Sequence, residues 1–162
     1  NGIKKSYAAS FGNVINEPKV NEFFSKYLSS YSSILVREDS AQNYLNMLGL
    51  NASQVLDPTL VLEKEYWDNY VSPIKENNYI LIYQLHNDSK LGEIAKKIAI
   101  KENKKLIRIS ATFHQILRSG HFKYLPTIGE FLGYIKNASL LVTDSFHGTA
   151  FAINFETYKS AA

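Results

Sequence analysis

The stretch LLVTDSFHGTAF, from Leu140 to Phe151, shows how this chain folds, because an apolar run ends there in a polar turn and a second apolar run begins. Residues 139–142 have the pattern of a short buried strand, and residues 149–155 have that of an apolar helix. Residues 143–148 are therefore predicted to form a strand-to-helix turn. In open α/β sheets ligands bind at such turns, where a strand's carboxyl end meets the free N–H groups and positive dipole end of a helix. The turn contains His147, so the question is whether this histidine does chemistry or caps the helix.

The same alternation of strand and helix extends over the rest of the chain. We predict strands at residues 6–11, 33–36, 54–56, 79–84 and 105–109, and helices beginning at Pro18, at Asp39 or Ser40, near Glu63, at Asp88 and at Thr127. Glu130 stands three residues after Thr127 and completes a capping box. Residues 112–126 have no clear period and are predicted to form a long loop, of the kind that tends to carry function. Alternating strands and helices predict an α/β fold with parallel, Rossmann-like sheets and helices on both faces.

The periodic pattern is weakest between residues 57 and 78, so we place a domain boundary there. Residues 1–60 would be the later half of one Rossmann-like domain, residues 61–78 a linker or crossover, and residues 79–162 most of a second such domain. The chain does not open with Met, and its first residues resemble the inside of a protein. We therefore expect a truncated chain.

Composition excludes several classes of protein. Of the 162 residues 45% are apolar and 20% are charged, and the net charge is +3, so neither disorder nor a nucleic-acid partner is indicated. The chain has no cysteine, which removes disulfides, thiolate metal sites and cysteine nucleophiles and fits a reducing compartment. No apolar run approaches the ~18 to 20 residues that a membrane span needs.

Two familiar kinds of catalytic centre do not fit the spacing of the polar residues. Asp144, Ser145 and His147 are the residue types of a hydrolase triad, but groups so close in sequence cannot be arranged as nucleophile, base and orienter. The nucleophile-elbow pattern is also absent around Ser145. His114 and His121 lack the further ligands of a metal site. We therefore predict neither a triad nor a bound metal.

Arg37 has the same topological position as His147. In the stretch ILVREDS, residues 34–40, it stands directly after a predicted strand and before a helix cap. An arginine fork at the carboxyl end of a strand suits a carboxylate or a phosphate. The alternative is a surface ion pair with Glu38 or Asp39. Together, Arg37 and His147 suggest an anionic ligand held between two α/β units.

Five stretches, taken in order, resemble the polysaccharide pyruvyl transferase family: SYAASFG, ILVREDS, VLDPTL, YILIYQL and NASLLVTDSFHGTAFAINF. The resemblance covers nearly the whole chain, without the family's first stretch and its final strand and helices. It implies two Rossmann-like domains that face each other, similar to GT-B glycosyltransferases, with ligands in the cleft. It also implies transfer of the enolpyruvyl group of phosphoenolpyruvate to two hydroxyls of a sugar on a cell-surface glycan.

The resemblance further implies roles for particular residues. His147 would be the general acid or a phosphate-binding cation, since a histidine with a pKa near ~6.5 can donate or accept a proton near neutral pH. Arg37 would clamp the carboxylate or phosphate of the donor, and no metal or other cofactor is implied. The further candidates for substrate binding are Ser10, Ser145, Gly148 and Thr149.

One departure from the family concerns the donor. Other branches carry Arg-Leu-His where this chain has Ser145, Phe146 and His147. Loss of that arginine removes a contact with the donor phosphate. Either Arg37 and an absent segment supply the charge, or this branch uses another donor.

Two other functions are left open. One is a GT-B-like glycosyltransferase that uses a nucleotide sugar, for which Glu156 is the candidate contact to the ribose. The other is a non-catalytic carbohydrate-binding domain or an inactive fragment. In the preferred interpretation the partners are phosphoenolpyruvate and a glycan or lipid-linked sugar, in the cytoplasm of a bacterium or at the inner face of its membrane. A homodimer is also left open. The candidates for acceptor contact are His114, Arg118, His121, Lys123 and Tyr124.

Overall fold

The computed structural model describes residues 2–12, 17–87 and 89–157. The chain forms two compact units, Asn1–Val61 and Leu62–Ala162, and each is described by itself. The predicted helix start at Asp88 and the outermost residues of the two predicted domains lie outside the described residues. Within the described ranges, no helix combines the length and the apolar character that crossing a membrane requires.

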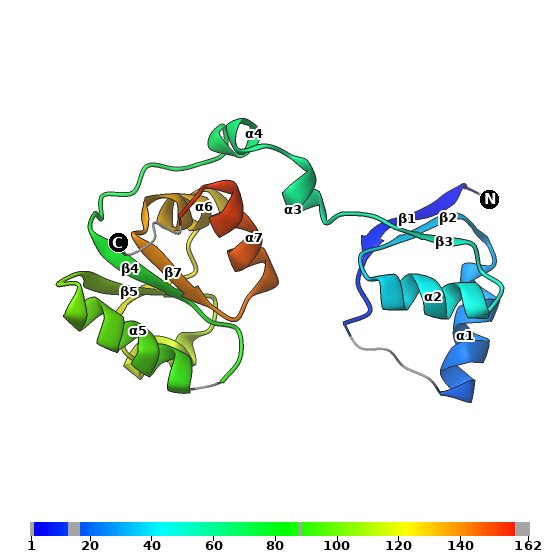
Figure 1. Cartoon of the computed structure of the whole chain (residues 1–162), viewed down its shortest axis with the longest axis horizontal. Helices are drawn as coiled ribbons and strands as arrows, with labels where there is room; N and C mark the ends of the chain where they lie inside the picture. The colour runs from blue at the N-terminus through cyan, green and yellow to red at the C-terminus, as the bar shows by residue number, and fades with distance from the viewer. Residues whose placement is uncertain (1, 13–16, 88, 158–162) are drawn as a thin grey trace. The chain divides into compact units, whose positions relative to one another are not determined.

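The first unit is a three-stranded parallel sheet in the order β1-β2-β3 with helices beside it. Its elements are β1 (Lys4–Ala9), α1 (Pro18–Leu28), β2 (Tyr31–Val36), α2 (Asp39–Met47), β3 (Ala52–Gln54) and α3 (Pro58–Val61). Alternate residues of β2, Ile34 and Val36, are buried with Tyr44 and Leu45 of α2. Helices α1 and α2 both cover this one face of the sheet (Figure 1).

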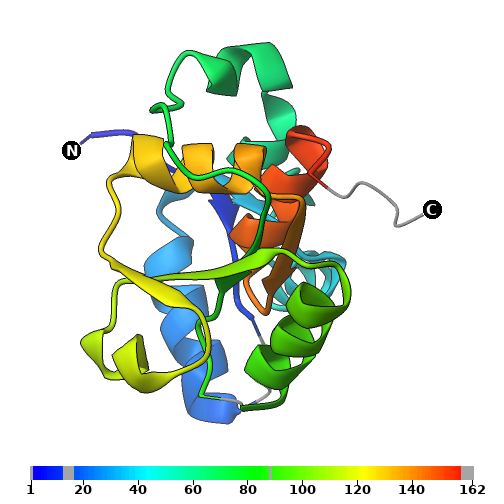
Figure 2. The same ribbon diagram turned by 90° about the vertical axis from the view of Figure 1, so that its left-hand side faces the viewer.

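The second unit is a four-stranded parallel sheet in the order β6-β5-β4-β7. Its elements are α4 (Lys64–Asp68), β4 (Tyr79–Tyr83), α5 (Ser89–Lys101), β5 (Lys105–Ser110), the 3-10 helix η1 (Phe113–Leu117), β6 (His121–Tyr124), α6 (Ile128–Asn137), β7 (Leu140–Thr143) and α7 (Phe146–Asn154). Helix α5 lies on one face of the sheet, and α6 lies on the other (Figures 1 and 2). The predicted α/β class with parallel sheets is therefore confirmed.

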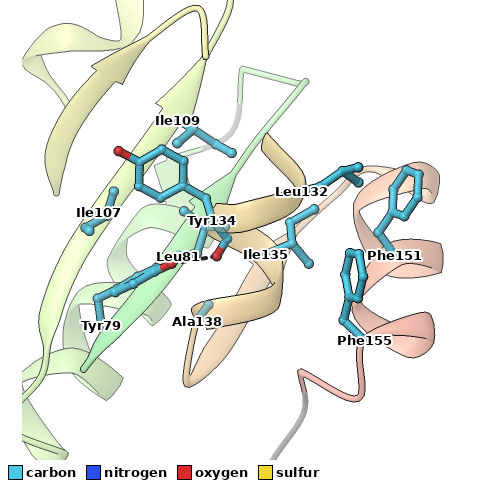
Figure 3. Close-up of a cluster of buried hydrophobic side chains, with 10 residues drawn as sticks. All are labelled: Tyr79, Leu81, Ile107, Ile109, Leu132, Tyr134, Ile135, Ala138, Phe151 and Phe155. Atoms are coloured by element: carbon cyan, nitrogen blue, oxygen red, sulfur yellow. Dashed lines mark hydrogen bonds between the residues drawn. The ribbon is translucent and has the colours of Figure 1, made fainter. Parts of the chain in front are cut away.

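The main core of the second unit lies between the sheet and helices α6 and α7. Alternate residues of β4 and β5 point to this side, among them Tyr79, Leu81 and Ile109 (Figure 3). The Tyr79 hydroxyl donates a 2.8 Å hydrogen bond to the Tyr134 carbonyl oxygen of α6. Burial raises the pKa of Tyr79 far above its usual value, so this phenol is a neutral hydrogen-bond donor that links strand to helix.

The strand order reverses between β4 and β7, which are neighbours in the sheet although they are far apart in the chain. The chain leaves β4 for α5 on one face and leaves β7 for α7 on the other. At such a switch point the two connections diverge, and a crevice opens at the carboxyl ends of the strands. The polar turn that follows β7 is therefore at the position where α/β proteins bind ligands.

Two predictions made for the loops are wrong. Residues 112–126, predicted to be a long loop, contain η1 and the four-residue strand β6. Strand β6 is too short to show a period, and it forms by pairing with β5 at the edge of the sheet. The predicted turn at residues 143–148 is also shorter than expected, because α7 begins at Phe146.

Of residues 61–78, which we expected to form a linker or crossover, residues 62–78 belong to the second unit. The Trp67 ring meets the Phe151 ring edge to face, with centroids 5.0 Å apart. A Cβ atom added to Gly133 of α6 would be only 2.3 Å from the Ser72 carbonyl oxygen. The backbone around residue 72 therefore packs so closely on α6 that only glycine fits there.

Candidate functional site

Asp144 links the two strand ends at the switch point of the second sheet. It is the first residue after β7, and its carboxylate accepts hydrogen bonds from the backbone N–H groups of Leu85 (2.7 Å) and His86 (2.9 Å), which follow β4. The Nδ1 atom of His86 is 3.1 Å from the same carboxylate, a distance that fits an Nδ1–H donor. The loops after β4 and β7 are thus held together by one side chain.

The environment of Asp144 keeps it ionised. Burial acts to raise its pKa, but the hydrogen bonds from Leu85 and His86 outweigh burial and hold the pKa below the usual value. The His86 side chain is 79% exposed, so its other ring nitrogen faces solvent. Asp144 therefore orients His86.

Ser145 is the cap of α7. Its Oγ accepts a hydrogen bond from the Gly148 N–H at 3.2 Å, and its carbonyl oxygen accepts from the Thr149 N–H and the Thr149 hydroxyl, both at 3.0 Å. Ser145 is only 3% exposed. Three of the residues predicted to bind substrate are thus occupied in closing the first turn of the helix. An anion that took either N–H group would have to compete with these bonds.

Gly148 allows α7 to pack against the strand ends. A Cβ atom at this position would be 2.9 Å from the Thr143 Oγ1 and 3.2 Å from the Tyr83 Cδ1. Both distances are shorter than ordinary van der Waals contact, so a larger residue would push the helix away from the sheet. The glycine places the first turn of α7, and with it His147, close to the carboxyl ends of β4 and β7.

His147 lies in the first turn of α7 with its side chain exposed. Its ring meets the exposed Phe146 ring edge to face, with centroids 5.3 Å apart. The capping bond of α7 is made by Ser145 and not by His147. An exposed imidazole at the switch point can donate or accept a proton at a ligand held there.

A second feature of this edge is an apolar cavity of about 210 Å³ on the α6 side. Its walls come from the ends of β4 and β5 and the start of α6, with Tyr83, Ile109, Pro126 and Phe131 among them. Burial, followed by the nearby charge of Asp144, raises the pKa of Tyr83, which is therefore neutral. Such walls suit the apolar face of a small organic group.

In the first unit, Arg37 is paired with a carboxylate that the sequence did not suggest. Its Nη1 donates to Oδ2 of Asp57, which is 5% exposed and follows β3. Asp57 also accepts from the N–H of Thr59 (2.9 Å) and from its hydroxyl (2.6 Å). Burial acts to raise the pKa of Asp57, but the bonds from Thr59 and Arg37 together lower it below the usual value. The ion pair that the structure shows for Arg37 is thus with Asp57, and its alternative pairing with Glu38 or Asp39 stays a prediction.

Glu38 instead joins the loops that follow β1 and β2. The Ser10 hydroxyl donates to one Glu38 carboxylate oxygen, and the Phe11 N–H donates to the other at 3.3 Å. The Ser10 Oγ in turn accepts from the Gly12 N–H at 3.2 Å. Ser10 is exposed at the carboxyl edge of the sheet, but its hydroxyl already serves this network.

The structure thus divides the candidate residues between two sheet edges. His147, Ser145, Gly148 and Thr149 share the first turn of α7, whereas Arg37 and Ser10 lie at the carboxyl edge of the first sheet. Asp57 and His86 were missed, although each directly follows a strand-like run in the sequence. The described residues contain no group of three or more histidine, aspartate or glutamate side chains that could hold a metal ion.

The chain was also compared with known proteins. A family model described as "Polysaccharide pyruvyl transferase" matches residues 2–158 of the 162. No curated protein and no solved structure matches the chain.

Proposed function

This chain belongs to the polysaccharide pyruvyl transferase family, and on that premise we propose that it transfers the enolpyruvyl group of phosphoenolpyruvate to hydroxyls of a sugar in a cell-surface glycan. The observation that carries the proposal is the position of His147. It is an exposed histidine in the first turn of α7, at the point where the strand order of the second sheet reverses.

The reaction needs proton transfers that one histidine can supply. The methylene carbon of the donor gains a proton, and the adjacent carbon becomes electrophilic. Two sugar hydroxyls add to that carbon, each losing its proton, and phosphate leaves as the second C–O bond forms. The products are a pyruvate ketal and inorganic phosphate, so atoms and charges balance without a redox partner. His147 acts as the acid toward the methylene carbon, because an imidazolium is a competent donor near neutral pH.

The other candidate residues have supporting parts in the proposal. Ser145, Gly148 and Thr149 position His147 by closing the first turn of α7. Arg37 is a proposed contact for a carboxylate or phosphate of the donor, because a guanidinium at the carboxyl end of a strand suits such groups. Ser10 remains a proposed substrate contact through its exposed hydroxyl. The apolar cavity beside Tyr83 is suited to an apolar face of the sugar acceptor.

The test measures phosphate release from phosphoenolpyruvate in the presence of a panel of glycan acceptors. General acid catalysis contributes on the order of 100-fold or more, so His147→Ala should lower turnover by at least about that factor. The matched control is Lys97→Ala, which removes an exposed basic side chain of α5 that has no part in the proposed site. Circular dichroism should show that both variants keep the fold. An unchanged rate in His147→Ala would overturn the assignment.

One departure from the family favours a second candidate function. Ser145 stands where other branches of the family carry arginine, and its hydroxyl is used in the helix cap. In other branches that arginine contacts the phosphate of phosphoenolpyruvate. A glycosyltransferase that uses a nucleotide sugar has a different donor and would not need this contact. Thermal stabilisation by uridine diphosphate, with none by millimolar phosphoenolpyruvate, would favour this alternative, because a ligand that binds the folded state must stabilise it.

A further inference from the structure

The second sheet contains a buried arginine that the sequence analysis did not single out. Arg108 lies within β5 and is 1% exposed, on the face that α5 covers. Its Nε donates to the Ser119 carbonyl oxygen at 3.0 Å. Its Nη1 donates to the side-chain oxygens of Gln84 and Gln115, each at 3.0 Å. All of these acceptors are neutral.

Within the described part of the chain, no carboxylate forms an ion pair with Arg108. A second cation is close by, since Arg118 Nη1 is 3.5 Å from the same Gln84 oxygen. Burial, followed by repulsion from Arg118, lowers the pKa of Arg108, although an arginine stays protonated in proteins. A buried charge without a counter-charge is costly. An anion placed between the two arginines would offset both the burial and the repulsion.

A cavity of about 230 Å³ adjoins the two guanidinium groups. Its walls include Arg108, Arg118 and Ser119 on one side and Ser89, Gly92 and Glu93 of α5 on the other. The volume is several times the ~30 Å³ share of a water molecule in the liquid, so the cavity can hold a tetrahedral oxyanion.

The free end of Arg108 points to this cavity. A Cβ atom added to Gly92 would be 3.0 Å from Arg108 Nη2, so glycine leaves the room in front of that nitrogen. Arg108 Nη2 has no acceptor among the described residues, whereas Nε and Nη1 are both used. Ser89 is the first residue of α5, a helix of 13 residues whose positive dipole end lies at this wall.

We propose that this cavity is a binding site for a phosphoryl group, either free phosphate or the phosphate of a larger ligand. Two arginines, serine hydroxyls and a helix amino end form the donor set that recognises phosphate. Glu93 also lines the cavity and acts against any anion there through like-charge repulsion. The site does not rest on the proposed transfer reaction, since phosphate binding here requires no turnover.

The experiment titrates the protein with inorganic phosphate by isothermal titration calorimetry, with acetate as the comparison anion. Arg118→Gln should weaken phosphate binding by about tenfold or more, as expected for loss of one charge-assisted hydrogen bond. Gly92→Ala should abolish binding, because its methyl group fills the space in front of Nη2, while alanine favours the helix. Glu93→Gln should tighten binding.

The matched control is Lys101→Gln, which removes one exposed positive charge at the other end of α5. It should leave phosphate affinity unchanged. The proposal is overturned by absence of binding at millimolar phosphate, by equal binding of acetate, or by equal losses in Lys101→Gln and Arg118→Gln. Because the readout is phosphate affinity, its failure would leave the His147 turnover experiment unaffected.

Discussion

Arg37 and Arg108 lie near the carboxyl edges of two different sheets, and their surroundings are opposite. Arg37 is partly exposed and donates to the buried carboxylate of Asp57. Arg108 is almost completely buried, and its acceptors among the described residues are all neutral oxygens. The position of Arg37 directly after a strand suggested a ligand contact, yet its own chain supplies the counter-charge. The comparison shows that the place of an arginine in a sequence pattern does not reveal whether the folded chain supplies its counter-charge.

The largest effect should come from removing the buried arginine. Arg108→Ala leaves a cavity and deprives Gln84, Gln115 and Ser119 of a donor, so we expect a loss of roughly 3 kcal/mol in the free energy of unfolding. Trp67, the chain's one tryptophan, lies in the second unit, so its fluorescence during urea denaturation reports on that unit.

The control for this prediction is Arg118→Ala. Arg118 is less buried, and its side chain makes one long bond at 3.5 Å, so its loss should cost below about 1 kcal/mol. Equal effects of the two substitutions would mean that Arg108 is no more strongly held than a surface arginine, and the contrast with Arg37 would then be lost.

A smaller loss of stability should follow from breaking the ion pair between Arg37 and Asp57. Arg37→Ala and Asp57→Asn should each destabilise the first unit, and the double variant should be less harmful than the sum of the two. We expect a coupling energy of about 1 kcal/mol, because the carboxylate is buried but the guanidinium is partly exposed to solvent. Hydrogen exchange of β2 and β3 amides measures the first unit alone. Strict additivity would show that the ion pair contributes nothing.

The smallest effect is on the pH dependence of stability. The pKa of Asp57 is lower in the folded protein than its ordinary value of 3.8. Its contribution is therefore fully present above about pH 4 and is lost as the pH falls through the lower, folded-state pKa. Asp57→Asn should flatten the acid side of the stability curve of the first unit. Arg108 titrates far above this range, so Arg108→Ala should leave the acid slope unchanged.

Much of the fold could be predicted because its signals are local. The predicted strand at residues 79–84 is found as β4, Tyr79–Tyr83, because this run is almost continuously apolar, and Thr127 with Glu130 starts α6 through the predicted capping box. The order of strands and helices then determines parallel pairing. The turn after β7 was found for the same reason, and with it His147.

Only the tertiary structure decided which groups meet at the strand ends. Asp57 is 20 residues from Arg37, and Asp144 is 58 residues from His86, so no local sequence pattern predicts either contact. The burial of Arg108 depends on α5 covering β5, and β6 exists only because β5 offers it a partner. Propensity and periodicity act over a few residues, whereas charge compensation and edge-strand pairing depend on which segments the packed sheets bring together.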